Sequence, residues 1–174
     1  AAATRHEHYR VDALRTQLLG CHQAKPTKSS GGDSGIGRAV SVLFAREGAK
    51  VAIAYLDEDT DAQETAKLVE DEGSEALLIP GDLGGKAHCE EVAATVVGHF
   101  GQLDIVVNNA AQQWIDEDFA NFPEEKLRRI IASNIYGPMF MTQAALPHLG
   151  DGASIINTTS VNAYKGNDSL ITYS

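Results

Sequence analysis

Short apolar runs alternate with amphipathic helical segments along most of this chain, and this alternation restricts its fold more than any other feature. The runs are rich in valine, isoleucine and alanine and lie at residues 51–55, 76–79, 103–107 and 154–159. Apolar side chains at helical spacing mark the segments between them, at residues 38–47, 59–72, 89–100 and 123–149. Strands and helices in this order predict βαβ units, and therefore an α/β fold with a doubly wound parallel sheet.

The ends and faces of two helices can be read in more detail. The first is expected to end at Gly48 and to bury one face, made of Ile36, Ala39, Val40, Leu43 and Phe44. The last should begin near Pro123, kink at Gly137-Pro138 and continue to about Leu149.

The N-terminal residues fit this pattern poorly. Residues 1–29 are polar and without a sustained period, so we expect an irregular or partly disordered leader ahead of one domain at residues 30–174. The central strand should directly precede the glycine-rich turn at residues 30–37, but residues 25–29 include Pro26 and two lysines. The first strand is therefore predicted to be atypical, and its loss would leave the centre of the sheet unfilled and the fold unstable.

Charge and composition exclude several classes of function. The formal net charge of -10 disfavours nucleic acid and anionic membranes as partners. Cys21, Cys89 and the scattered histidines lack the spacing of metal ligands, so we expect free thiols and no metal. No apolar run reaches the roughly 18 residues of a membrane span, and residues 1–30 lack the regions of a signal peptide. The sequence therefore predicts a soluble, cytoplasmic protein that acts on a small molecule.

Three glycines, Gly31, Gly35 and Gly37, lie where a strand should end and a helix begin. Glycine permits a tight turn and a close approach of the backbone to a pyrophosphate, and the helix N-terminus that follows can bind the negative charge. Such a pattern on its own also matches plain flexible turns. The amphipathic helix after it favours a dinucleotide site.

Five separated motifs together resemble one family. Ser30-Gly31-x-x-x-Gly35-x-Gly37 is similar to the TGxxxGxG cofactor motif of the short-chain dehydrogenase/reductase family. The other landmarks follow in the family's order: Asp82-Leu83, Asn108-Asn-Ala-Ala111, Asn134, and the pair Ser160 and Tyr173. Residues 155–167 look most like the glucose/ribitol dehydrogenase-like branch, although the family usually has glycine where this chain has Ala111. The resemblance covers residues 30–174 and implies a Rossmann-type sheet that is truncated after its fifth strand.

The resemblance also implies which residues bind the dinucleotide. Asp82 would accept a hydrogen bond from the adenine amino group with Leu83 packed nearby, and the alternative is a strand-end turn aspartate. Residues 108–111 would let the backbone lie against the adenosine ribose, and by themselves indicate only a sharp turn. The implied cofactor-binding set is Ser30, Gly31, Gly35, Ile36, Gly37, Arg38, Tyr55, Asp82, Leu83, Asn109, Ala110 and Ala111.

The implied catalytic residues are Asn134, Ser160 and Tyr173. Asn134 would hold a water in a proton relay or, alternatively, be a satisfied buried amide. Ser160 would bond the substrate oxygen, and Tyr173, 13 residues later, would give or take the hydroxyl proton while the nicotinamide carries the hydride. The family lowers the pKa of this tyrosine with a lysine four residues on, at a position that follows Ser174. We therefore expect little catalysis from the chain as given.

Cofactor preference and assembly are less determined by the sequence. The strand-end position that carries an acid in NAD-binding proteins is Tyr55 here, and Arg38 could assist a phosphate or be a solvated helix charge. This gives NADP a slight preference over NAD. The family commonly forms tetramers through the long helix, here residues 123–149, so a homo-oligomer is expected. The alternative to an NAD(P)-dependent oxidoreductase is a non-catalytic dinucleotide-binding or interaction module.

Overall fold

A five-stranded parallel sheet forms the centre of the molecule. The computed structural model describes residues 16–20, 35–115 and 118–174. The strands are β1 (Thr16–Gly20), β2 (Lys50–Tyr55), β3 (Ala76–Pro80), β4 (Leu103–Asn108) and β5 (Leu149–Asn157). Their order in the sheet is β3-β2-β1-β4-β5, and every neighbouring pair is parallel. This confirms the predicted α/β fold with a parallel sheet.

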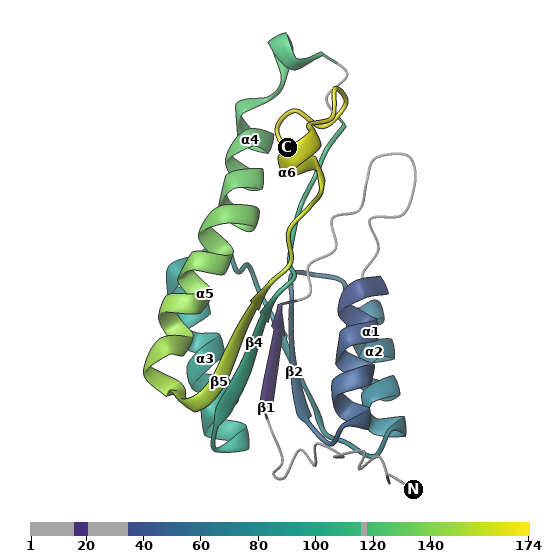
Figure 1. Cartoon of the computed structure of the whole chain (residues 1–174), viewed down its shortest axis with the longest axis vertical. Helices are drawn as coiled ribbons and strands as arrows, with labels where there is room; N and C mark the ends of the chain where they lie inside the picture. The colour runs from purple at the N-terminus through teal and green to yellow at the C-terminus, as the bar shows by residue number, and fades with distance from the viewer. Residues whose placement is uncertain (1–15, 21–34, 116–117) are drawn as a thin grey trace, which may run out of the picture.

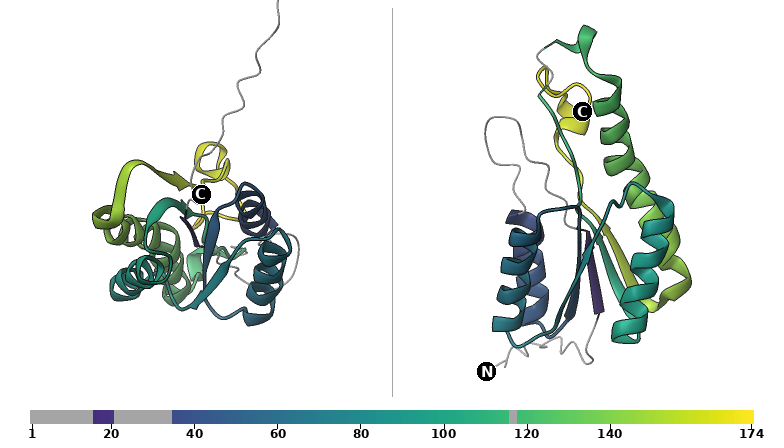
Figure 2. Two further views of the ribbon diagram at one scale, coloured as in Figure 1. Left: turned by 90° about the horizontal axis from the view of Figure 1, so that it is seen from below. Right: turned by 180° about the vertical axis from the view of Figure 1, so that it is seen from behind.

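Helices cover both faces of this sheet (Figure 1). The main helices are α1 (Gly35–Arg46), α2 (Asp59–Asp71), α3 (Lys86–Phe100), α4 (Glu124–Ile131) and α5 (Gly137–Ala145). Shorter helical segments are η1 (Phe119–Asn121), η2 (Ala132–Tyr136), η3 (Leu146–His148) and α6 (Asn162–Lys165). Figure 2 shows α1 and α2 on one face and α3 and α5 on the other, which is the doubly wound arrangement.

The first strand is not where the sequence places it. β1 lies at Thr16–Gly20, inside the predicted leader, and pairs through Gln17 with Val51 of β2 and Ile105 of β4. The centre of the sheet is therefore filled by β1, which lies earlier in the chain than the sequence analysis places the first strand. Residues 25–29, which directly precede the glycine-rich turn, lie outside the described residues.

The position of β1 defines where a ligand can bind. The chain runs outward from β1 through β2 to β3, and then returns past β1 to β4 and β5. In open α/β sheets, ligands bind beyond the carboxyl ends of the strands at the point where the order reverses. That point lies here between β1 and β4, at the edge toward which the strands run upward in Figure 1.

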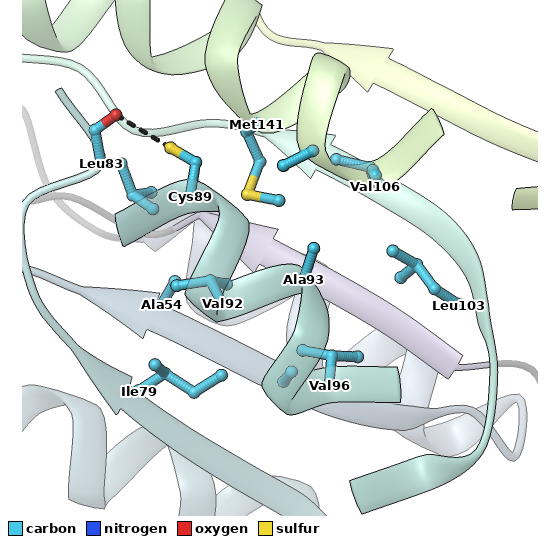
Figure 3. Close-up of a cluster of buried hydrophobic side chains, with 13 residues drawn as sticks. Ala54, Ile79, Leu83, Cys89, Val92, Ala93, Val96, Leu103, Val106 and Met141 are labelled. Atoms are coloured by element: carbon cyan, nitrogen blue, oxygen red, sulfur yellow. Dashed lines mark hydrogen bonds between the residues drawn. The ribbon is translucent and has the colours of Figure 1, made fainter. Parts of the chain in front are cut away.

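Alternate residues of β2 pack on opposite faces of the sheet. Ala52 and Ala54 join the larger core under α3 and α5, which also contains Cys89, Val92, Val96, Leu103, Val106 and Met141 (Figure 3). Val51 and Ile53 join a smaller core with Ala45 of α1 and Val69 of α2. Both cores lie below the carboxyl edge and hold the strand ends in register.

The buried face of α1 is narrower than predicted. Val40 and Phe44 pack against Ile105 and Val107 of β4, as the helical spacing indicates. Ile36 and Leu43, however, are 59% and 55% exposed, and Ala39 is exposed as well. The predicted five-residue face is therefore only partly correct, because the sheet covers one narrow stripe of this helix.

The long helix is interrupted by a π segment and ends earlier than predicted. η2 is a π-helical stretch, and the Gly137 amide bonds to the Ala132 carbonyl five residues earlier. Pro138 has no amide hydrogen to continue the α-helical pattern, which accounts for an irregularity at this place. The helix then ends at Ala145, and Leu149, predicted to be helical, is the first residue of β5.

Candidate functional site

Segments from most of the motifs meet at the carboxyl edge of the sheet. Residues 35–38 begin α1, residue 55 ends β2, and residues 81–85 follow β3. Asn108 ends β4 and residues 109–112 follow it, while residues 158–160 follow β5. Because parallel strands end at the same edge, this end of the molecule collects polar and backbone groups from five loops.

The N-terminus of α1 points into this edge. Gly35 is the first residue of the helix and is exposed, Gly37 is buried, and the Ile36 side chain is exposed. The amides of a first helical turn have no partners within the helix and attract anions. Ser30 and Gly31, the first part of the predicted motif, lie outside the described residues.

The Arg38 side chain bonds to residues of α2. Its Nε donates to Thr65 Oγ1 over 3.0 Å, and its Nη2 contacts Glu64 Oε2 at 3.2 Å. A further bond from Nη2 reaches the carbonyl oxygen of Asp61 over 3.3 Å. The guanidinium therefore joins α1 to α2, and its contact with the cofactor stays a prediction.

Tyr55 is the last residue of β2. Its ring is 8% exposed, and its hydroxyl donates to Asp59 Oδ1 over 2.8 Å. Burial, and then the bond to Asp59, raise the pKa of Tyr55 above its usual value. The Gly81 amide donates to the Tyr55 carbonyl over 2.7 Å, which ties the ends of β2 and β3 together.

Asp82 lies in the loop after β3 and bonds both to that loop and to α4. Asp82 Oδ1 accepts a hydrogen bond from the Gly84 amide over 2.9 Å, and Oδ2 accepts one from Arg129 Nη1 of α4 over 2.7 Å. Leu83 is buried in the larger core, and its carbonyl accepts from Cys89 Sγ over 3.2 Å (Figure 3). The carboxylate that the sequence assigns to adenine is thus fixed in place and remains 43% exposed.

Glycine is needed where this loop meets the long helix. A Cβ at Gly137 would lie 3.3 Å from the Leu83 carbonyl oxygen. A Cβ at Gly84 would lie 3.1 Å from the Cβ atom of Ala132. Such distances are shorter than ordinary van der Waals contacts. The two glycines therefore let the loop that carries Asp82 pack directly on the helix that carries Asn134.

The Asn-Asn-Ala-Ala segment begins with a structural asparagine. Asn108 is buried, and its Nδ2 donates to Asn157 Oδ1 of β5 over 2.8 Å. A longer bond of 3.4 Å reaches Thr142 Oγ1 of α5, and the Asn108 carbonyl accepts from the Thr158 amide over 2.9 Å. This supports the structural role that the resemblance implies for Asn108. Half-buried residues follow it, namely Asn109, Ala110 and Ala111.

Asn134 is bonded at both ends of its amide. Its Oδ1 accepts from the Gln112 amide over 2.7 Å, and its Nδ2 donates to the Gln112 carbonyl over 2.8 Å. The side chain therefore joins the π segment to the chain after β4. Sequence reasoning missed Gln112, whose only signal is that it directly follows the Asn-Asn-Ala-Ala motif.

Ser160 and Tyr173 lie in neighbouring segments above the sheet. Ser160 follows β5, and its Oγ accepts from the Asn162 amide over 3.2 Å at the start of α6. The Tyr173 amide donates to the Leu170 carbonyl over 3.0 Å. In both Figure 1 and Figure 2 the C-terminal residues lie beside α6 and near α4. The direct approach of the Tyr173 phenol to Ser160 stays a prediction.

The described residues fit a dinucleotide better than a metal. They offer a helix N-terminus for a pyrophosphate, a fixed and half-exposed carboxylate at Asp82, and small residues after β4. Within residues 16–20, 35–115 and 118–174 no three His, Cys, Asp or Glu side chains gather to hold a metal ion. Over the same ranges, no helix is long and apolar enough to cross a membrane.

Comparison with known proteins agrees with this geometry. Residues 31–174 match the family described as enoyl-(acyl carrier protein) reductase. A solved short-chain dehydrogenase/reductase from Serratia marcescens BCRC 10948 is similar with a TM-score of 0.79 and 29% identity, over 91% of this chain and 61% of that one. The chain belongs to the short-chain dehydrogenase/reductase family. The resemblance drawn from the five motifs is thereby confirmed.

Curated relatives indicate the glucose/ribitol dehydrogenase-like branch. Glucose and ribitol dehydrogenase of Daucus carota is 43% identical over 157 residues, which are 87% of this chain and 54% of the relative. NADPH-dependent aldehyde reductase 1, chloroplastic, of Arabidopsis thaliana is 47% identical over 150 residues, 83% of this chain and 52% of the relative. A solved Burkholderia cenocepacia J2315 short-chain dehydrogenase in complex with NADP has a TM-score of 0.78 at 28% identity, over 92% of this chain and 60% of that one. This member of the family spans about half the length of these curated relatives.

Proposed function

We propose that this chain carries the dinucleotide site and part of the catalytic apparatus of an NAD(P)-dependent oxidoreductase. Its substrates would be small alcohols or carbonyl compounds of the sugar or aldehyde type, the class named in two of its relatives. One observation supports this most strongly: the α1 N-terminus, Asp82, the segment after Asn108 and Ser160 lie at one edge of the sheet, and Asn134 of η2 bonds to the segment after Asn108. Parallel strands bring these segments to the same edge, and there they present a helix N-terminus, a carboxylate and small residues, which are the groups that a dinucleotide needs.

In this proposal the first-turn amides of α1 bind the pyrophosphate and Asp82 accepts from the adenine amino group. Residues 109–111 line the adenosine ribose with small side chains. The bound nicotinamide supplies or accepts the hydride. Arg129 orients the Asp82 carboxylate through a hydrogen bond of 2.7 Å from its Nη1 to Oδ2.

Ser160 and Tyr173 are proposed to act on the substrate. The Ser160 hydroxyl would donate to the substrate oxygen, and the Tyr173 phenol would exchange the hydroxyl proton. An unperturbed phenol with a pKa of about 10 is ionised in only roughly one molecule per thousand at pH 7, so a neighbouring cation is needed for rapid proton transfer. Both Asn134 amide ends are engaged by Gln112, so this side chain would hold the loop and helix in register around the proton path.

Replacing Tyr173 by phenylalanine tests this assignment in the whole protein. Tyr173→Phe removes only the hydroxyl, so we expect reduction of aldehydes by NADH or NADPH to be lost while dinucleotide affinity is retained. Tyr164→Phe is the matched control, because Tyr164 is 88% exposed on α6 and has no role in the proposal. Full turnover in Tyr173→Phe would refute the catalytic role, and a protein that binds dinucleotide without any turnover would be a binding module instead.

Assembly through the long helix is a separate proposal. Leu127, Ile131, Ile135 and Met139 follow one another at four-residue spacing and are 36–56% exposed. Exposed apolar side chains in such a row are typical of an interface between subunits. We propose a homo-oligomer, a tetramer by analogy with the family, and light scattering of the eluted protein would measure its mass.

A further inference from the structure

The first residues of β5 do not pair regularly with β4. Leu149 lies opposite Leu103, and the next paired residue of β5 is Ser154, opposite Ile105. Residues 150–153 therefore form a bulge, whose backbone groups are left out of the ladder with β4. β5 is also the outer strand of the described sheet, next to β4 (Figure 1).

This bulge contains Asp151 followed directly by Gly152, and both residues are exposed. Nowhere else in the sequence is an aspartate or asparagine followed by glycine. Gly152 has a φ of +81°, with nothing within 4 Å of the position that a Cβ would take. Among the described residues, none forms a hydrogen bond or ion pair with the Asp151 carboxylate. Neither group of this dipeptide is therefore shielded by a neighbouring side chain.

An aspartate followed by glycine can react with its own backbone. The nitrogen of the glycine bonds to the side-chain carboxyl carbon, and the amide hydrogen leaves with the carboxyl hydroxyl as water, which gives a succinimide ring. Water then opens the ring at either carbonyl. One opening restores aspartate, and the other gives isoaspartate, in which the main chain runs through the side-chain carboxyl and is one methylene longer.

Ring closure requires the peptide group after Asp151 to turn toward the carboxyl group. A regular ladder opposes this rotation, because it holds the backbone amides in hydrogen bonds. The bulge frees the dipeptide from the ladder with β4, and the glycines on both sides of Asp151 permit main-chain conformations that other residues rarely adopt. The fold therefore leaves this dipeptide free to react.

Asp168 and Ser169 show the opposite arrangement. Both are exposed, but the Ser169 amide donates to Asn167 Oδ1 over 2.9 Å, and the Ser169 hydroxyl donates to Asp168 Oδ1 over 3.2 Å. The nitrogen that would attack and the carboxyl group that would be attacked are each engaged. The two aspartates are therefore similar in exposure and should differ in reactivity.

We propose that Asp151-Gly152 is a site of spontaneous succinimide formation in the folded chain, and that isoaspartate accumulates there. Water is the only other reactant, so the modification needs neither an enzyme nor a cofactor. The site lies near the start of β5, about 16 Å along the strand from Asn157 at the carboxyl edge. The inference is therefore independent of the proposed dinucleotide site.

Prolonged incubation of the folded chain in water enriched in heavy oxygen, at mildly acidic pH, tests the proposal. Each passage through the succinimide places one solvent oxygen in residue 151, whether aspartate or isoaspartate results. After digestion in ordinary water, mass spectrometry should locate heavy oxygen at this residue in the tryptic peptide 130–165, in which Asp151 is the only aspartate. A growing fraction of that peptide should also resist an endoproteinase that cleaves before aspartate but not before isoaspartate.

Asp151→Glu is the matched control, because glutamate keeps the charge but would have to close a larger and less favourable ring, so residue 151 should stay unlabelled. In the wild type, Asp168 should gain heavy oxygen more slowly than Asp151, and labelling of Asp151 should be about as fast in the folded chain as in urea. Labelling of Asp151 in urea alone would overturn the proposal, because the fold would then protect the dipeptide. Equal labelling of Asp151 and Asp168 in the folded chain would overturn it as well, because exposure alone would then decide the reactivity.

Discussion

Gly81 connects the end of β3 to Asp82, and alanine at this position should be costly for two separable reasons. Its φ of +145° lies in a region that residues with a Cβ rarely adopt, which costs about 1–3 kcal/mol. A Cβ there would also overlap the ring of His88, which lies in the first turn of α3. Overpacking of this kind costs about 1–3 kcal/mol more, so Gly81→Ala should lose about 2–6 kcal/mol of unfolding free energy.

A double-mutant cycle with His88→Ala separates the two costs. In the His88→Ala background the overlap is absent, so Gly81→Ala should cost only the about 1–3 kcal/mol of backbone strain. Urea denaturation followed by circular dichroism measures all four free energies. The difference between the two backgrounds gives the energy of the overlap with the imidazole.

Gly98→Ala is the matched control for this cycle. Gly98 lies inside α3 with nothing within 4 Å of the Cβ position, so alanine should stabilise the chain by about 0.5–1 kcal/mol. A loss in Gly81→Ala below about 0.5 kcal/mol would refute the strain at this turn. An equal loss in both backgrounds would refute the contact with His88.

Two further predictions concern the side chains of Asn134 and Cys89. Asn134→Ala removes both hydrogen bonds to the Gln112 backbone and should lower the free energy of unfolding in urea by about 2–4 kcal/mol. Asn121→Ala, the control at an exposed asparagine of η1, should lower it by less than about 1 kcal/mol. Equal losses in the two variants would contradict the role of the Gln112 bonds. Burial, with Asp82 and Glu90 nearby, raises the pKa of the Cys89 thiol to about 11, so only roughly one molecule in a thousand is thiolate at pH 8. Iodoacetamide should therefore modify Cys89 in urea but not in the folded chain, as followed by peptide mass spectrometry, and rapid labelling of the folded chain would show that the thiol is accessible.

The sequence predicted the strands whose side chains are buried on both faces. Residues 51–55 and 103–107 are continuous apolar runs, which are typical of parallel strands covered by helices, and both are strands in the structure. β1, with the sequence Thr-Gln-Leu-Leu-Gly, has no such run and is not adjacent to the glycine-rich turn. Its place depends on pairing with β2 and β4, which only the tertiary structure shows.

Motif spacing located candidate residues but not their partners. Asn134 was found from its position in the order of landmarks, yet its bonds to Gln112 depend on how the π segment faces the chain after β4. The position of Arg38 after the glycine turn indicates that it could assist a phosphate, but it does not reveal the bonds of its guanidinium to Thr65 and Glu64 of α2. Side-chain direction in both cases is decided by a neighbouring element that is distant in sequence.

The same limit applies to the helix faces. A helical wheel places Ile36 and Leu43 of α1 with Val40 and Phe44, but the sheet reaches only the latter two. Periodicity indicates which side chains share a face and does not give the width of the surface that covers them.

Amide hydrogen exchange with and without NADH tests the central claim, a dinucleotide site at the carboxyl edge of the sheet, most directly. We predict slower exchange in residues 35–38, 82–85 and 108–112 when NADH is added, because these amides lie at the proposed site. Residues 72–75 and 101–102, which precede β3 and β4 at the opposite edge, should be unchanged. Unchanged exchange at the carboxyl edge, or equal slowing at both edges, would contradict the claim.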